Sequence, residues 1–197
     1  MDRSVQKRFL VKALTGSMLM MGFVVQAHAG SLLPGKWRSD FRVQINGRDS
    51  TVVMSQFAAQ VRATMPTQLK SGSGVGLNAI GNMGSATVCM TPAVAATQTS
   101  PTRIFNTYTQ MNPRCKLVAG TPTYDSVPFT GRCDDPFTYT GNVSGVVKVY
   151  SLSKWSATMQ GAGLFPDSVL KSLGLPAKTV VLMNTTASSN LLSSSCQ

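Results

Sequence analysis

The sequence predicts a mainly β protein: a single antiparallel β-meander domain, a curved sheet or open barrel, with one or two short helices after an N-terminal signal peptide. Three observations carry this prediction. Short runs of alternating apolar and polar residues recur along the chain, as in half-buried strands. Gly, Pro and Asn residues that form turns separate these runs. The chain also has four cysteines, an even number typical of exported, disulfide-linked domains.

Residues 1–29 have the three parts of a secretory signal peptide. Basic residues come first, an apolar run from Ala13 to Val25 follows, and Ala27-His28-Ala29 gives the small-x-small pattern of a cleavage site. The apolar run is shorter than the roughly 20 residues of a membrane-spanning helix. We therefore expect cleavage after Ala29, a periplasmic location and no transmembrane span in the mature chain. Residues 30–197 are then expected to form one disulfide-linked, β-rich domain.

The first strands and the main helix are predicted in the first third of this domain. Phe41 to Ile45 alternates apolar and polar residues, and Asn46-Gly47 is the sequence of a type I′ turn. Thr51 to Met54 is expected to return as the partner strand. Residues 55–69 have helical spacing, with Ser55 as the cap, and the Gly-rich stretch 71–84 follows as a loop. This helix and loop are expected to form a mobile cover or contact surface.

The second half of the domain is predicted to consist mostly of short strands. A strand is expected over 86–90 and a short helix from Thr91 or Pro92 to Thr97, whereas 102–111 has no clear periodicity. The later predicted elements are strands over 116–118, 128–133, 137–140, 143–152, 155–160 and 179–186, turns at Asn112-Pro113 and Gly141-Asn142, a helix over 167–173, and a polar tail over 188–195. This series favours an antiparallel meander.

Cys89, Cys115, Cys133 and Cys196 are predicted to form two disulfides. Their spacing does not fit a zinc site, and the chain has no CxxC motif. Four cysteines allow three pairings. We favour Cys89–Cys115 with Cys133–Cys196, because the second bond would tether the Ser-rich C-terminus to the core.

The residue inventory argues against an enzyme. His28 is the only histidine and lies in the signal peptide, and the chain has no Glu. A Ser-His-Asp or Cys-His nucleophile therefore cannot be assembled in the mature chain. Asp134-Asp135 is the one acidic pair, and because adjacent side chains diverge, we interpret it as a turn before Pro136. The sequence predicts no catalytic residue, no cofactor and no metal ligand.

Charge and aromatic residues suggest binding instead. The chain has 18 basic and 7 acidic residues, a formal net charge of +11, without a dense basic run. This balance fits a solvated surface, or contact with lipid headgroups, surface polysaccharide or an acidic envelope protein. No nucleic-acid-binding motif is present, so nucleic acid is not expected as a partner. Trp37 and Trp155 are expected to anchor the core, with an aromatic ligand platform as the alternative.

Several motifs follow one another in an order that is similar to a known family. They are Leu33-Pro34-Gly35-Lys36-Trp37, the stretch 54–84, Thr87 to Pro92, Arg114-Cys115-Lys116, Phe129 to Cys133, and Cys196. Together they resemble the Pro-Gly-x-Trp motif, the variable helix, the Cys-[Leu/Met]-Thr-Pro motif and the later cysteines of DUF3617, exported bacterial proteins of unknown function. The resemblance implies export and a small, disulfide-linked β domain, without catalytic residues. Residues 161–178 depart from the family pattern, which leaves their role and the last strand pairing open.

The leading hypothesis is a non-enzymatic exported envelope protein that binds a partner or an apolar or anionic ligand. A structural component of a periplasmic secretion or surface assembly is the alternative, and an enzyme of unknown type comes third. An apolar cavity larger than about 300 Å³ on the concave side would favour ligand binding. A filled core with an exposed apolar patch would favour a protein partner.

Overall fold

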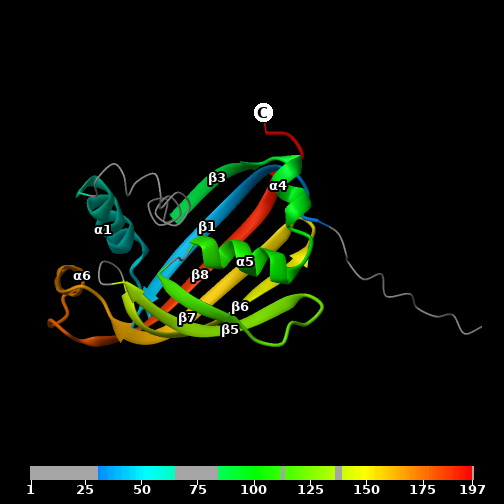
Figure 1. The fold of residues 1–197 in the computed structure, drawn as a ribbon. Coiled ribbons are helices and arrows are strands. Elements are labelled where there is room, and N and C mark those ends of the chain that lie inside the picture. Colours follow the sequence, from blue (N-terminus) through cyan, green and yellow to red (C-terminus); the bar gives the residue numbers. More distant parts are fainter. Residues whose placement is uncertain (1–30, 65–83, 112–113, 136–138, 197) are drawn as a thin grey trace, which may run out of the picture.

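A computed structural model describes residues 31–64, 84–111, 114–135 and 139–196 of the chain (Figure 1). The strands are β1 (Gly35–Ile45), β2 (Arg48–Asp49), β3 (Gly84–Met90), β4 (Cys115–Ala119), β5 (Ser126–Asp135), β6 (Tyr139–Ser151), β7 (Lys154–Leu164) and β8 (Val180–Ser193). The helices are α1 (Thr51–Thr64), α4 (Pro92–Thr97), α5 (Pro101–Met111) and α6 (Asp167–Ser172). The predicted signal peptide, most of the Gly-rich loop and the Asn112-Pro113 turn lie outside the described residues.

All eight strands belong to one antiparallel sheet that is open, not closed into a barrel, so the mainly β prediction is confirmed. Strands β4 to β8 form a continuous meander in which each strand pairs with the next in sequence. β1 pairs with β8 along most of its length and extends the meander. β2 and β3 both pair with the other side of β1. The pairing of β7 with β8, which the sequence left open, is therefore direct and long.

The sheet has an inner face covered by helices and an outer face without any in the described residues. Odd-numbered residues of β1 and β4 to β7, and of β8 as far as Leu191, lie on the inner face. Even-numbered residues of the same strands lie on the outer face and are mostly exposed. α5 crosses the inner face, where it contacts β4, β5 and β6, while α1 and α6 lie together at one end (Figure 1).

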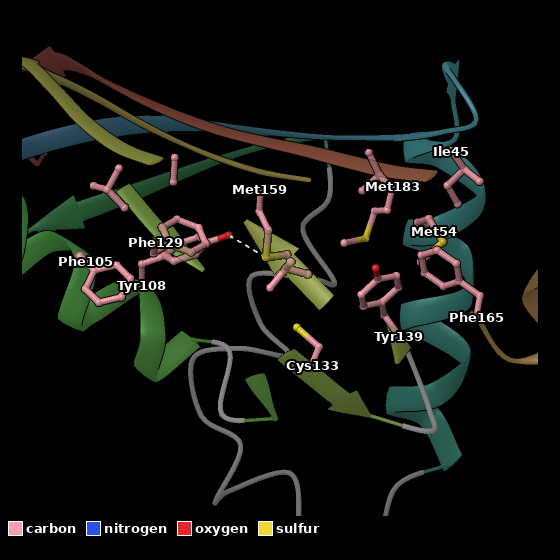
Figure 2. Close-up of a cluster of buried hydrophobic side chains, with 14 of the residues drawn as sticks. Ile45, Met54, Phe105, Tyr108, Phe129, Cys133, Tyr139, Met159, Phe165 and Met183 are labelled. Atoms are coloured by element: carbon pink, nitrogen blue, oxygen red, sulfur yellow. Dashed lines mark hydrogen bonds between the residues drawn. The ribbon is translucent and has the colours of Figure 1, made fainter. Parts of the chain in front are cut away.

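The core fills the space between the inner face and the helices (Figure 2). Under α5, Phe105 and Tyr108 pack on Phe129, with ring centroids 5.5 and 5.7 Å apart. At the other end, Tyr139 packs on Phe165 at 5.3 Å, next to Met54 of α1. Burial of these side chains explains why α5 is a helix: its apolar residues Ile104, Phe105 and Tyr108 recur at helical spacing.

Glycines on the inner face make room for two of these aromatic rings. A Cβ at Gly141 or Gly161 would lie 2.7 Å from the hydroxyl oxygen of Tyr139, and one at Gly163 would lie 2.8 Å from the same ring. A Cβ at Gly145 would lie 2.5 Å from Phe129 Cζ. Real Cβ atoms do not come this close to other heavy atoms, so the rings reach the backbone only because these positions are glycine. Gly141 therefore belongs to β6, and the turn predicted at Gly141-Asn142 is wrong.

The segment after the first hairpin also differs from the prediction. Asn46 and Gly47 both have positive φ, 51° and 77°, so the predicted turn is confirmed. However, the returning strand β2 has only two residues, and Thr51–Thr64 is helical from the residue where a strand was expected. An Asp49 carboxylate oxygen accepts a hydrogen bond from Thr51 N at 2.9 Å, and Ser50 O accepts one from Met54 N. These bonds start the helix before Ser55, against the strand preference of the β-branched residues at its start.

Other boundaries moved because strands gain stability from neighbours on both sides. β8 continues to Ser193, where a polar tail was predicted, because it pairs with β1 and β7 as far as Asn190 and with β1 beyond it. Asp134 and Asp135, interpreted from the sequence as a turn, are the last residues of β5 and pair with Thr140 and Tyr139. The short helices at 92–97 and 167–172 are confirmed, the first with Thr91 Oγ1 accepting a hydrogen bond from Val94 N.

The two disulfides are present, but the favoured pairing is wrong. The structure joins Cys89 to Cys196 and Cys115 to Cys133. Cys115 and Cys133 are direct partners on β4 and β5, so the register of the hairpin brings them together. Cys196 follows β8, and it reaches Cys89 on β3 because β1 lies between these two strands. The C-terminus is tethered as expected, but to the edge strand β3.

Mapping the disulfides and removing each in turn tests this pairing. Peptides from non-reduced protein should join Cys89 to Cys196, and a Cys89–Cys115 peptide would contradict the structure. The bonds close loops with sequence separations of 107 and 18 residues. Loop entropy then predicts losses of unfolding free energy of about 5 kcal/mol for Cys89→Ser/Cys196→Ser and about 3 kcal/mol for Cys115→Ser/Cys133→Ser. Urea unfolding measures both.

Replacing Gly145 tests the contact between glycine and aromatic ring. In Gly145→Ala, the new methyl group would meet both Phe129 and the carbonyl oxygen of Thr158. We expect the unfolding free energy in urea to fall by about 2 kcal/mol or more, because neither neighbour can move freely. Gly120→Ala is the matched control, since its Cβ would come no closer than 3.3 Å, to the Pro128 side chain. Equal effects of the two substitutions would contradict the argument.

Tyr108 makes the stability of the core sensitive to alkaline pH. Its hydroxyl donates to Met159 Sδ at 3.8 Å, and burial raises the pKa of the phenol to about 12. In the unfolded chain the phenol ionises near pH 10, so the contribution of Tyr108 is complete below pH 10. Above that pH, unfolding free energy should fall by about 1.4 kcal/mol per pH unit up to pH 12. The unfolding free energy of Tyr108→Phe, measured in urea at pH 9, 10 and 11, should fall less steeply than that of the unmodified protein. Parallel curves for the two proteins would contradict this assignment.

Candidate functional site

The outer face of the sheet carries an excess of positive charge. All seven basic residues of β1 and β4 to β7 are at outer-face positions: Lys36, Arg38, Arg42, Lys116, Arg132, Lys148 and Lys154. Asp40 and Asp134 are the acidic residues at outer-face positions of these strands. Two of the seven form ion pairs: Arg38 with Asp40 at 3.1 Å, and Lys148 with Asp125 at 3.4 Å. The outer face is therefore suited to an anionic partner.

A row of neutral polar side chains crosses the middle of this face, one from each of five neighbouring strands. The register aligns Gln44 of β1, Asn184 of β8, Gln160 of β7, Ser144 of β6 and Thr130 of β5. We call these residues the polar row. Neighbouring strands lie about 4.8 Å apart, so the row is about 19 Å long. Among the described residues, none of the five side chains has a hydrogen-bond partner. Their amides and hydroxyls are open to a ligand.

The polar row lines a broad, open hollow of about 910 Å³. Arg132, Asn142 and Leu182 also line it, and all three are at outer-face positions beside the row. Arg132 Nη1 donates to Asn142 Oδ1 at 3.5 Å, which directs the guanidinium along the face. Arg42 lies two residues before Gln44, at the opposite end of the row. The hollow thus combines uncharged hydrogen-bonding groups with a guanidinium near each end.

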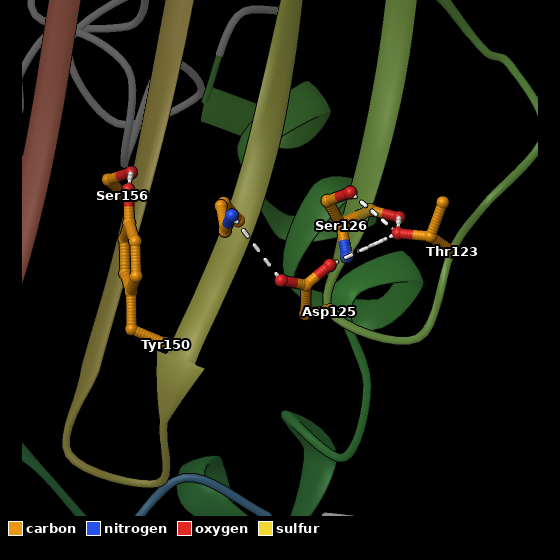
Figure 3. A network of polar contacts seen from close by, with 6 residues as sticks. Thr123, Asp125, Ser126, Tyr150 and Ser156 are labelled. Carbon is orange, nitrogen blue, oxygen red and sulfur yellow. Dashed lines mark hydrogen bonds and ion pairs between the residues drawn. The ribbon is translucent and has the colours of Figure 1, made fainter.

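A lysine-tyrosine group lies toward the other end of the outer face (Figure 3). Tyr150 is 55% exposed, and Lys148 Nζ and Lys154 Nζ lie 5.5 and 5.4 Å from its ring centroid. Asp125 binds Lys148 at 3.4 Å. Desolvation raises the pKa of the Asp125 carboxyl, but a hydrogen bond from Thr123 and the charge of Lys148 lower it below its ordinary value overall. This group offers an aromatic surface and cations to a ligand that extends beyond the hollow.

The inner face is filled where an apolar ligand site was considered. Trp37 is 1% exposed and donates its indole N–H to Leu33 O at 2.9 Å, while Trp155 is half-buried against the core. Both positions fit core anchors, and burial of Trp37 leaves no surface for a ligand platform. A smaller hollow of about 300 Å³ lies beside the start of α5, between Ile104 and Tyr150, and its lining is partly polar. The polar row was not identified from the sequence, because its residues are far apart in the chain.

Comparisons with known proteins give no family for the chain. No protein-family model matches it, and no curated protein matches it significantly. In the part of the chain that the structure describes, no helix has both the length and the apolar character needed to cross a bilayer. The function must therefore be argued from the outer face itself.

Proposed function

We propose that this protein is a non-enzymatic, exported envelope protein that binds an acidic polysaccharide on the outer face of its sheet. The proposal rests mainly on the polar row, whose five side chains lack hydrogen-bond partners within the described residues. Amide side chains both donate and accept hydrogen bonds, as sugar hydroxyls do. A row of such groups about 19 Å long suits an extended chain of sugars better than a single small molecule.

The charge of the outer face supports an acidic polysaccharide over a neutral one. Arg42 and Arg132 flank the polar row, and Lys116 on β4 lies beside Arg132 as its direct cross-strand partner. Guanidinium groups bind carboxylates and phosphates with two hydrogen bonds, so they favour sugars that carry these groups. Lys148, Lys154 and the exposed ring of Tyr150 extend the cationic surface for a longer chain.

Export and a periplasmic location belong to the same proposal. Two disulfides are typical of proteins that fold in an oxidising compartment, which supports cleavage of residues 1–29 and export. The proposed membership of DUF3617 fits an exported β domain with these cysteines. An envelope polysaccharide is then a ligand that the protein would meet.

A structural role in a secretion or surface assembly is the second candidate, and one observation favours it. β4 is an edge strand in the described residues, and its Val118 side chain is 66% exposed. An added strand from another protein would pair with this edge. Lys116 on the same strand limits such pairing, so we rank this role below polysaccharide binding.

Substitution in the polar row tests the proposed function. We expect the protein to bind immobilised, alkali-deacylated lipopolysaccharide, an acidic envelope polysaccharide, and not neutral dextran. Gln160→Ala/Asn184→Ala should weaken this binding about tenfold or more, because each amide loses hydrogen bonds to sugar hydroxyls. Surface plasmon resonance measures the affinity, and added NaCl should lower it because the contacts are charged.

The control is Asn106→Ala, which removes an exposed amide on α5, on the opposite side of the sheet. It should bind like the unmodified protein. Equal binding by the double variant, or equal binding of dextran and the acidic polysaccharide, would overturn the proposal.

A further inference from the structure

Three exposed aliphatic side chains form a small patch on the outer face. Leu164, Val180 and Leu182 are 39%, 63% and 66% exposed. Leu164 and Val180 are direct cross-strand partners, and Leu182 occupies the next outer-face position after Val180. We call these three residues the aliphatic patch. Single exposed aliphatic residues are common, but three adjacent ones form a surface that gains free energy when a ligand covers it.

The aliphatic patch is continuous with the hollow that the polar row lines. Leu182 itself lines this hollow, and Asn184 of the polar row follows it at the next outer-face position of β8. On β7, Ala162 is the partner of Leu182 and lies two residues after Gln160. A ligand in the hollow therefore contacts aliphatic groups on one side and amide groups on the other.

The row of residues next to the polar row changes from aliphatic to basic across the sheet. Its successive partners are Leu182 of β8, Ala162 of β7, Asn142 of β6, Arg132 of β5 and Lys116 of β4. Arg132 and Lys116 have no carboxylate partner among the described residues. The hollow thus offers an aliphatic end, a polar middle and a cationic end along one direction.

We propose that the ligand of the outer face is an anionic glycolipid. Its sugar hydroxyls bind the polar row, its phosphate or carboxylate groups bind Arg132 and Lys116, and the first part of an acyl chain covers the aliphatic patch. This inference rests on the proposed polysaccharide function and adds the lipid part of the ligand. A free polysaccharide would leave the aliphatic patch exposed, and a phospholipid bilayer without sugars would leave the polar row without partners.

The test compares the same glycan with and without its acyl chains. The probes are detergent-dispersed lipopolysaccharide, its alkali-deacylated form, and vesicles of phosphatidylglycerol. The unmodified protein should bind the acylated form about tenfold more tightly than the deacylated form, because the acyl chain covers the aliphatic patch. Phosphatidylglycerol vesicles should bind more weakly than either. Leu164→Ser/Val180→Ser, which changes the two residues of the aliphatic patch that do not line the hollow, should lose the tenfold difference and retain its affinity for the deacylated glycan.

Leu192→Ser is the matched control, because Leu192 is a 55% exposed leucine on the same strand but far from the hollow. It should keep the preference for the acylated form, and circular dichroism checks that all variants are folded. Equal binding of the two glycan forms by the unmodified protein would overturn the glycolipid proposal. Vesicle binding as tight as glycolipid binding would indicate a bilayer surface and overturn it as well.

The two proposals fail in different ways. If Gln160→Ala/Asn184→Ala leaves binding of the deacylated glycan unchanged, the polysaccharide function is wrong. If this double variant weakens binding but the Leu164→Ser/Val180→Ser variant keeps the preference for acyl chains, the polysaccharide function stands and the aliphatic patch has no part in it.

Discussion

The contact between the Tyr139 ring and three glycines, one on its own strand β6 and two on the neighbouring strand β7, allows the sheet to curve around its helices. Gly141, Gly161 and Gly163 bring the backbones of β6 and β7 against the ring, at distances that no Cβ would permit. Burial of the ring also raises the pKa of the Tyr139 phenol, and its hydroxyl donates to Asn142 O at 3.3 Å. The polar group is satisfied within the core, so the close approach leaves no unpaired hydroxyl.

This curvature separates the two faces of the sheet by function. The inner face encloses α5 and packs against α1 and α6, and its central residues Val127 and Val147 are fully buried. The inner face therefore forms one wall of the hydrophobic core. The outer face has no covering helix in the described residues and carries the seven basic side chains of β1 and β4 to β7. Under the proposed function, recognition takes place on the outer face, where charge and hydrogen-bonding groups meet solvent.

The sequence predicted what depends on local patterns and missed what depends on neighbours in space. Alternation identified most strands, and Asn46-Gly47 identified the first turn, because both signals act over a few residues. The disulfide pairing required the order of strands: Cys89 meets Cys196 only because β1 lies between β3 and β8. Gly141 was read as a turn residue, since the Tyr139 ring that requires a glycine there acts through packing. The polar row had no sequence signal, because Gln44 and Thr130 align only through the register of five strands.

The same glycines connect the packing of the core to the shape of the proposed site. Gly131 and Gly161 line the hollow from the outer side with backbone atoms. On the inner side, a Cβ at Gly161 would meet Tyr139, and one at Gly131 would lie 2.9 Å from Leu117 Cα. A larger residue at either position would push its strand outward, into the hollow, and would shift Gln160 or Thr130 relative to their partners. Because the proposed ligand contacts in the polar row depend on the spacing of its side chains, the core and the proposed binding surface are constrained by the same close packing.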